Sequence, residues 1–361
     1  SNSQSLFVFF NMLDKTAARI VNYISNKLLI VTCGQGLAHA GSFNMAEVYV
    51  GIDIGGMTIK GIVLDGSGKA LCEDAAVTGA ENGGEAMCDT IAELILSMLA
   101  KCGVPKEDAH IGVGCPGTIN SAEGVLVFSG NLNLRNFPLA KNIEKRIGLP
   151  VKVTNDANAA ALGEARFGAG KNYNDSILVT LGTGVGGGII IGGKLFEGHA
   201  SAGAEIGHMV IERHGDNCTC GRRGCFEAYC SATALVKRTK RQMEENPGSA
   251  MWTKYTAETA NGKTAFEFAD TDIDAKEVVD WYLKYLACGL ANLANIFRPE
   301  IIMLGGGVSE QGERLTAPLQ KLVDKELFGG TEYAPVKIVK ASLGSKAGAY
   351  GAAALAMRIG L

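Results

Sequence analysis

The stretch EIGHMVIERHGDNCTCGRRGCFE, residues 205–227, places His208 and three cysteines close together in a polar segment that begins at Glu205 and ends at Glu227. Three thiolates and one imidazole form the Cys₃His ligand set of closed, four-coordinate zinc sites. Ordinary free thiols in a glycine-rich loop are the alternative, but small apolar cysteines rarely cluster in so polar a segment. We therefore predict a zinc loop whose ligands are His208, Cys218, Cys220 and Cys225.

Two carboxylates, Glu205 and Glu227, stand at the two ends of this stretch and flank the predicted ligands. A closed zinc site has no open coordination position and therefore activates no water. The predicted zinc is structural, and its effect would be to fix these two flanking side chains.

The composition restricts the class of protein. The chain has 361 residues, 47% of them hydrophobic, which is enough for one large domain or two ordinary ones with a real core. A net charge of −3 argues against a nucleic-acid or anionic-membrane partner. No apolar run approaches the length of a membrane span, and the cysteines outside the loop show no disulfide pattern. We expect a cytoplasmic protein with no membrane or signal segment.

The chain changes character after about residue 46. The first 46 residues contain one candidate helix, at 12–30, and we interpret them as an N-terminal extension. From Val48 onward, short strands, glycine turns and helices alternate, which is typical of an α/β fold with two lobes. The predicted domains are an extension at 1–46, a small α/β lobe at 47–155 joined by a closing helix at 345–361, and a large lobe carrying the zinc loop at 156–344.

Two stretches, 48–64 and 176–191, share the order strand, glycine turn and returning strand, which amounts to a weak internal repeat. Backbone N–H groups in such turns can hold phosphate oxygens, and Asp53 at the rim of the first turn can position Mg²⁺. A plain hairpin is the alternative for the first turn taken alone. Two such turns, one in each lobe, could hold a triphosphate from both sides. A third glycine turn, around Gly306, would leave room for the base or ribose of a nucleotide.

Asn155 and Asp156 lie where a strand ends and an alanine-rich helix begins. Functional side chains are common at such junctions in α/β sheets. The alternative is an N-cap, because Asn or Asp at this position accepts hydrogen bonds from free helix N–H groups. Both interpretations can hold if one residue caps the helix and the other faces a cleft. An aspartate there could accept the proton of a substrate hydroxyl during phosphoryl transfer.

Six motifs in chain order resemble those of the ROK family: DIGGMTIK (53–60), GNLN (130–133), ND (155–156), LGTGVGGG (181–188), EIGH (205–208) and CTCGRRGCFE (218–227). The resemblance covers about 48–361, and the last two motifs carry most of its specificity. It implies a two-lobed actin-like (ribonuclease H-like) ATPase fold. Family members are sugar kinases and some sugar-responsive repressors. Within the family the chain looks most like the bacterial zinc-containing glucokinases, which implies phosphorylation of the 6-hydroxyl of glucose from ATP.

The resemblance also implies roles for individual residues. Asp156 would be the general base, and His208 would place one ring nitrogen on zinc and the other toward a sugar hydroxyl. Family members commonly have Thr where this chain has Met57, so the neighbouring Thr58 would supply that hydroxyl. The residues expected to bind the sugar are Gly117, Asn131, Asn155, Asp156, Glu205, His208 and Glu227. Those expected to bind ATP and Mg²⁺ are Asp53, Gly55, Gly56, Thr58, Lys60, Thr183, Gly184 and Gly306.

Three functions stay open at this point. The leading one is an ATP-dependent hexose kinase with ATP, Mg²⁺ and a structural Zn²⁺ as cofactors. A kinase for N-acetylmannosamine or N-acetylglucosamine is the nearest alternative. A sugar-responsive repressor would need a DNA-binding domain, and residues 1–46 are too short and too weakly basic for one. The expected partners are a hexose and a second copy of the chain in a homodimer, with no nucleic acid and no membrane.

Overall fold

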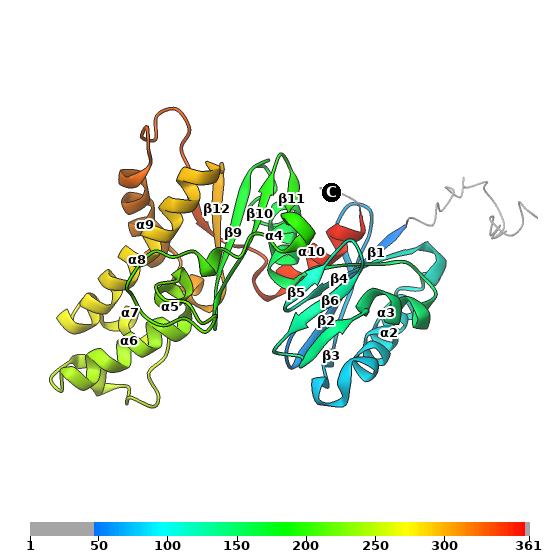
Figure 1. Ribbon diagram of the computed structural model, residues 1–361, viewed down its shortest axis with the longest axis horizontal. Helices are drawn as coiled ribbons and strands as arrows, with labels where there is room; N and C mark the ends of the chain where they lie inside the picture. Colours follow the sequence, from blue (N-terminus) through cyan, green and yellow to red (C-terminus); the bar gives the residue numbers. More distant parts are fainter. Residues whose placement is uncertain (1–46, 358–361) are drawn as a thin grey trace, which may run out of the picture. The chain divides into compact units, whose positions relative to one another are not determined.

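The computed structural model describes residues 47–357, which belong to one compact unit, Glu47–Leu361. The N-terminal extension predicted at 1–46, with its helix at 12–30, lies outside the described residues, as do residues 358–361. The fold is mixed α/β and is built around two five-stranded sheets and one three-stranded sheet (Figure 1). Within the described part of the chain, no helix has the length and apolar character needed to cross a membrane.

The first sheet has the strand order β3-β2-β1-β4-β8. Its strands are β1 (Val48–Ile54), β2 (Thr58–Leu64), β3 (Ala70–Val77), β4 (Ala109–Cys115) and β8 (Val151–Asn155). β1 pairs antiparallel with β2 and parallel with β4, and β4 pairs parallel with β8. The register places Asp53 opposite Gly114 and Cys115 opposite Asn155. The carboxyl ends of three parallel strands therefore meet at one edge, where functional groups gather in α/β sheets.

The second sheet repeats this topology with the strand order β11-β10-β9-β12-β13. Its strands are β9 (Ser176–Leu181), β10 (Val185–Ile191), β11 (Lys194–Phe196), β12 (Ile301–Gly305) and β13 (Lys337–Lys340). β9 and β10 form an antiparallel hairpin, and β12 lies parallel to both β9 and β13. The weak repeat predicted from the two glycine-turn hairpins thus extends to all five strands of each sheet.

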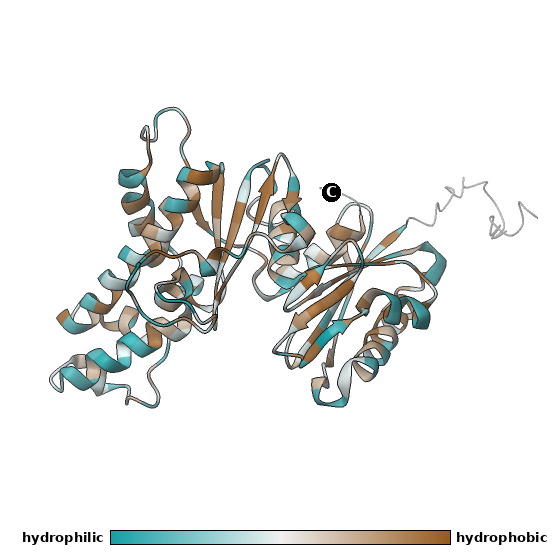
Figure 2. Ribbon diagram, viewed as in Figure 1, coloured by the Kyte–Doolittle hydropathy of each residue, from teal (hydrophilic) through white to brown (hydrophobic). Residues whose placement is uncertain are grey.

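Seven helices of nine or more residues lie within residues 47–357. They are α2 (Gly83–Cys102), α3 (Leu139–Ile147), α4 (Asp156–Phe167), α6 (Ala232–Glu245), α8 (Ile273–Phe297), α9 (Glu313–Glu326) and α10 (Ala347–Ala356). Two single-turn helices, α5 (Phe226–Cys230) and α7 (Thr264–Phe268), pack against α8. The strands are largely hydrophobic, whereas α3 and α6 carry many hydrophilic residues (Figure 2).

The segment that follows β4 forms a small sheet that the sequence analysis did not predict. Its strands are β5 (Thr118–Asn120), β6 (Val125–Ser129) and β7 (Leu134–Phe137). The buried side chains of Ile119, Leu126 and Leu132 join the core of the first sheet. The GNLN motif at 130–133 is the turn between β6 and β7. Strands this short give too little alternation to be recognised by periodicity.

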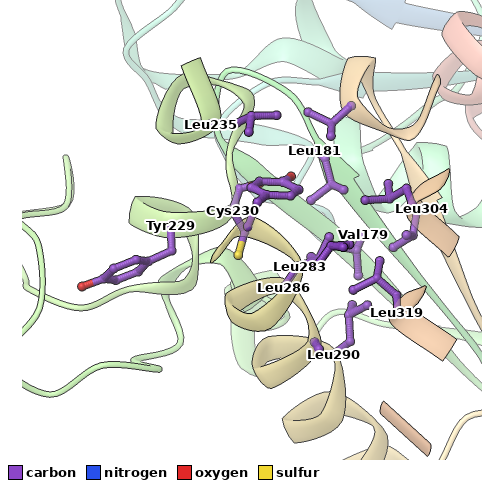
Figure 3. Packing of buried hydrophobic residues seen from close by; sticks show 14 of the residues in the cluster. Val179, Leu181, Tyr229, Cys230, Leu235, Leu283, Leu286, Leu290, Leu304 and Leu319 are labelled. Atoms are coloured by element: carbon purple, nitrogen blue, oxygen red, sulfur yellow. The ribbon is translucent and has the colours of Figure 1, made fainter. Parts of the chain in front are cut away.

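The cysteine loop, residues 218–225, is joined to the core of the second sheet by α5, which packs on α8. Val179 and Leu181 on β9 pack with Leu283, Leu286 and other α8 residues (Figure 3). Phe226, the first residue of α5, is fully buried in the same cluster. Because α5 begins directly after Cys225, the loop predicted to bind zinc ends on a rigid part of the core.

The helices α4 and α10 pack against each other and against the two large sheets. α10 contacts β1 and β4 of the first sheet, and α4 contacts β9 and β10 of the second. The strands of the two sheets come from either side of the boundary expected at residues 155 and 156. The exact lobe boundaries stay a prediction.

Candidate active site

Two adjoining cavities lie beside the start of α4 and share Asp156, Ala157 and Thr180. The first, here called the polar cavity, has a volume of about 520 Å³. It is lined by every residue expected to bind the sugar: Gly117, Asn131, Asn155, Asp156, Glu205, His208 and Glu227. The second, here called the glycine-rich cavity, has a volume of about 530 Å³ and is lined by Asp53, Lys60 and the turns at 305–307 and 344–348. Asp156 thus lies where the two cavities meet.

Asn155 caps α4 and leaves Asp156 facing the cavities. The Asn155 side-chain oxygen accepts hydrogen bonds from the N–H groups of Ala157 at 2.9 Å and Asn158 at 3.2 Å. Its amide nitrogen donates to the Gly117 carbonyl at 3.0 Å, so the cap also holds the turn after β4. The Asp156 carboxylate accepts from the Ala157 N–H at 2.9 Å. One residue therefore caps the helix while the next lines both cavities, as the sequence allowed.

The carboxyl groups of Asp53 and Asp156 both have raised pKa values. Burial raises the pKa of Asp53 to about 6, with a further contribution from Asp156 and an opposing one from Lys60. Burial also raises the pKa of Asp156, although hydrogen bonds from the backbone at Ala157 and from Asn155 lower it. Two partly buried carboxylates at one sheet edge provide the hard oxygen ligands that Mg²⁺ prefers. A carboxyl with a raised pKa is also suited to act as a base near neutral pH.

Five of the eight residues expected to bind ATP and Mg²⁺ line one or the other cavity. Asp53, Lys60 and Gly306 line the glycine-rich cavity. Thr183 and Gly184 line the polar cavity instead. The turn residues Gly55, Gly56 and Thr58 line neither cavity. In that turn the Gly55 N–H donates to the Thr58 carbonyl at 3.0 Å, so this group serves the hairpin itself.

The predicted zinc ligands come together as the spacing requires. One ligand atom from each of His208, Cys218, Cys220 and Cys225 lies within 4.8 Å of all the others. Cys218 Sγ is 3.7 Å from His208 Nδ1, and Cys220 Sγ is 3.7 Å from Cys225 Sγ. Tetrahedral zinc with thiolate and imidazole ligands separates neighbouring ligand atoms by about 3.5–3.8 Å. The four side chains therefore fit a zinc ion.

The thiol chemistry of this cluster also fits a metal. Burial and the neighbouring thiols of Cys220 and Cys218 raise the pKa of Cys225 to about 12. Without a cation, Cys225 would be protonated at neutral pH. Zinc binding deprotonates coordinating thiols, because the ion stabilises the thiolate form.

Glu227 connects the cysteine loop to the second glycine turn. One of its oxygens, Oε2, accepts a hydrogen bond from the Val185 N–H at 3.1 Å. Its other oxygen accepts from the Thr219 hydroxyl at 3.0 Å. A Cβ at Gly184 would lie 2.3 Å from Glu227 Oε2, so any larger residue there would displace this carboxylate. The geometry of the cysteine loop thereby fixes a carboxylate on the wall of the polar cavity.

Comparison with known proteins identifies the family. Residues 49–359 match the model of the ROK family. The chain belongs to the ROK family. A glucokinase from Streptomyces coelicolor is 38% identical over 316 residues, which span 85% of this chain and 96% of that protein. A glucokinase from Thermotoga maritima is 39% identical over 313 residues, which span 85% of this chain and 96% of that protein.

Solved structures agree with this membership. A crystal structure of a ROK family glucokinase from Streptomyces griseus, in complex with glucose and AMPPNP, has a TM-score of 0.72 at 36% identity. The match covers 86% of this chain and 99% of that chain. The resemblance inferred from the six sequence motifs is therefore confirmed.

Several residues lining the cavities of this ROK chain were missed by sequence reasoning. Glu164 on α4 is fully buried and lines the glycine-rich cavity. Its carboxylate accepts hydrogen bonds from the N–H groups of Ala169, Ser342 and Leu343 at 2.9, 3.0 and 2.6 Å. It thereby fixes the chain before Ser345, whose carbonyl accepts from Lys60 Nζ at 3.0 Å. The one available signal was a carboxylate within the apolar run AALGEARF.

Proposed function

We propose that this chain is an ATP-dependent hexose kinase that transfers a phosphoryl group to the 6-hydroxyl of glucose. The observation that carries the proposal is the position of Asp156, which lines both the polar and the glycine-rich cavity. A phosphoryl transfer needs its acceptor hydroxyl in line with the donor phosphate and within hydrogen-bond reach of one base. The Streptomyces griseus relative, whose structure contains glucose and AMPPNP, supports the choice of sugar and nucleotide.

Glucose would bind in the polar cavity. Asn131, Asn155, Glu205, His208 and Glu227 would offer amide, carboxylate and imidazole groups to its hydroxyls. A sugar presents several hydroxyls that each donate and accept, so convergent polar groups of this kind give it a fixed orientation. Burial of the 6-hydroxyl away from water would favour transfer to sugar over hydrolysis.

Asp156 would accept the proton of the 6-hydroxyl as the oxygen attacks the γ-phosphate. Its position at the N-terminus of a twelve-residue helix favours the carboxylate form, and burial opposes that form. Lys60 would face the phosphates across the glycine-rich cavity and offset their negative charge. Asp53 would hold Mg²⁺, which when bound neutralises charge on the ATP phosphates.

The cysteine loop would hold a structural Zn²⁺ through His208, Cys218, Cys220 and Cys225. With four protein ligands the ion would have no open position, so it would take no part in phosphoryl transfer. Its contribution would be to hold His208 and Glu227 in place. His208 lines the polar cavity and belongs to the ligand cluster, which supports its dual role.

A coupled assay with glucose and ATP tests the proposal, with the Asp156→Asn variant as its critical arm. Asparagine has nearly the same shape but cannot accept the proton, so we expect kcat to fall by roughly 10²–10⁴-fold while glucose binding survives. Asp108→Asn, which lies outside both cavities, should behave like the wild type. A wild-type rate retained by Asp156→Asn would leave Asp156 as part of the helix cap alone.

A further inference from the structure

The loop that follows β11 links the second sheet to β8 of the first sheet and to the segment after β5 of the small sheet. One oxygen of Glu197, Oε1, accepts hydrogen bonds from the Ser121 hydroxyl at 2.7 Å and the Thr154 hydroxyl at 2.8 Å. Ser201 in the same loop accepts from the Ser121 N–H at 3.3 Å. Ser121 follows β5, and Thr154 is a fully buried residue of β8. We call this set of four residues, Glu197, Ser201, Ser121 and Thr154, the Glu197 clasp.

The loop is closed on itself and has a strained backbone. The Gly203 N–H donates to the Glu197 carbonyl at 2.8 Å, which joins its two ends. Ala200, Ser201 and Ala204 have φ values of 53°, 58° and 62°, in the left-handed region that non-glycine residues rarely adopt. Such conformations persist only where the surrounding structure holds them, and they gather at functional sites. The hydrogen bonds of the clasp hold this loop to β8 of the first sheet through Thr154 and to the segment after β5 of the small sheet through Ser121.

Both ends of the clasp reach the candidate active site. Ser201, Gly203 and Ala204 line the polar cavity, directly before Glu205. Thr154 immediately precedes Asn155 and Asp156. Glu197 itself lines neither cavity, so it would act through the groups that it holds.

We propose that Glu197 is a positioning residue for the sugar, which holds the 201–205 wall of the polar cavity in register with β8, the strand that leads directly into Asp156. The inference rests on the proposed function, because it assigns the polar cavity to the sugar. A carboxylate suits this role, since a single charged oxygen can accept two hydroxyl donors strongly. Loss of that oxygen would leave the buried Thr154 hydroxyl without its acceptor and free the loop to relax.

Steady-state kinetics of Glu197→Ala and Glu197→Gln test the proposal with glucose and ATP varied separately. We expect the alanine variant to raise the KM for glucose about tenfold or more, the usual effect of losing charge-assisted hydrogen bonds. The KM for ATP should change less than about twofold, because the nucleotide would occupy the other cavity. Glutamine can accept both hydroxyls through its carbonyl oxygen, so it should restore most of the glucose affinity.

Two further variants separate positioning from general stability. Glu93→Ala on α2 removes an exposed glutamate that lines neither cavity and should leave both KM values unchanged. Thr154→Val keeps the shape of the side chain but removes its hydroxyl. Combined with Glu197→Ala it should add little to the rise in glucose KM, because both changes remove the same contact.

The outcomes distinguish the clasp from the proposed function. The wild type must first phosphorylate glucose, and if it does not, the proposed function fails. In that case the effect of Glu197→Ala is measured as a change in glucose affinity by calorimetry. Equal rises in the two KM values, or a glutamine variant as impaired as the alanine variant, would mean that Glu197 has a merely structural role. An unchanged glucose KM in Glu197→Ala would overturn the positioning role outright.

Discussion

At the scale of single residues, Asp53 shows how a buried carboxylate in the candidate site lowers the stability of the fold. Its pKa in the folded chain is about 6, above the ordinary value of 3.8. The folded state therefore binds the proton more tightly than the unfolded chain does. The stability that this proton provides is fully present below pH 3.8 and is lost as pH rises through about 6. At neutral pH the ionised Asp53 destabilises the fold.

Asp53→Asn should therefore raise the free energy of unfolding at pH 7.5 by on the order of 1–3 kcal/mol, since asparagine is neutral and nearly isosteric. The gain should shrink as the pH is lowered toward 4.5, where Asp53 is largely protonated in the wild type. Turnover should be lost at the same time, because the amide cannot replace a carboxylate ligand of Mg²⁺. Urea unfolding at the two pH values, together with the coupled assay, measures both effects.

Asp65→Asn is the matched control, with the opposite sign. A hydrogen bond from the Ser67 hydroxyl lowers the pKa of Asp65, so its carboxylate stabilises the fold at neutral pH and not in acid. That variant should be less stable than the wild type at pH 7.5. If Asp53→Asn also lost stability at pH 7.5, the ionised Asp53 carboxylate would stabilise the fold, which contradicts the raised pKa.

At the scale of elements, the cysteine loop should depend on a bound metal. Protein purified without chelators should contain about one Zn²⁺ per chain, as a four-ligand site requires. Cys220→Ser should lower both the zinc content and the Tm, because the loop loses one of four ligands. Chelation of the wild type should also raise the KM for glucose, since Glu227 hydrogen-bonds to Thr219 within the loop. Elemental analysis, thermal melts and the coupled assay measure these effects.

Cys72→Ser on β3 serves as the control, because Cys72 lies outside the ligand cluster. It should keep the zinc content of the wild type. A fully active, thermally stable preparation that contains no zinc would rule out the structural role of the ion.

The packing of α10 on α4 is a second prediction at this scale. A Cβ at Gly351 would lie 1.5 Å from the Ala159 carbonyl oxygen, so the two helices approach closely only because residue 351 is glycine. Gly351→Ala should destabilise the fold by about 1–3 kcal/mol or more, because the backbones must separate. Gly66→Ala, at a turn where a Cβ meets nothing within 4 Å, is the control and should change the stability little. Urea unfolding compares the two variants, and equal stabilities would contradict this close packing.

At the scale of the whole molecule, sequence reasoning identified the local features and missed the long-range ones. The glycine-turn hairpins, the Asn155-Asp156 junction and the cysteine loop are each contained within short stretches, so spacing and periodicity were enough to find them. Glu164 bonds to Leu343, 179 residues away, and Glu197 to Ser121, 76 residues away. Such partners become visible only when the chain has folded, because no local pattern connects them.

The same limit applies to the cavities. The residues expected to bind the sugar were named from family motifs, and all seven of them line the polar cavity. Among the residues expected to bind the nucleotide, Gly55, Gly56 and Thr58 form a hairpin turn that lines neither cavity, and their role stays a prediction. A glycine turn indicates exposed N–H groups, but only the fold decides which of them face a ligand.

The choice of sugar depends on how rigidly the whole polar cavity is built. Glu227 is held by Val185 on one oxygen and by Thr219 on the other, so it has little freedom to move aside for a bulky substituent. A 2-acetamido group would need an apolar niche at the edge of the sugar ring, and it would leave a polar partner unpaired. We expect glucose to exceed N-acetylmannosamine and N-acetylglucosamine by at least about tenfold in kcat/KM, the usual effect of one lost polar contact. A coupled assay across these sugars with ATP measures the ratio. Faster turnover of an N-acetyl sugar would reverse the sugar preference while leaving the base, the zinc loop and the fold unaffected.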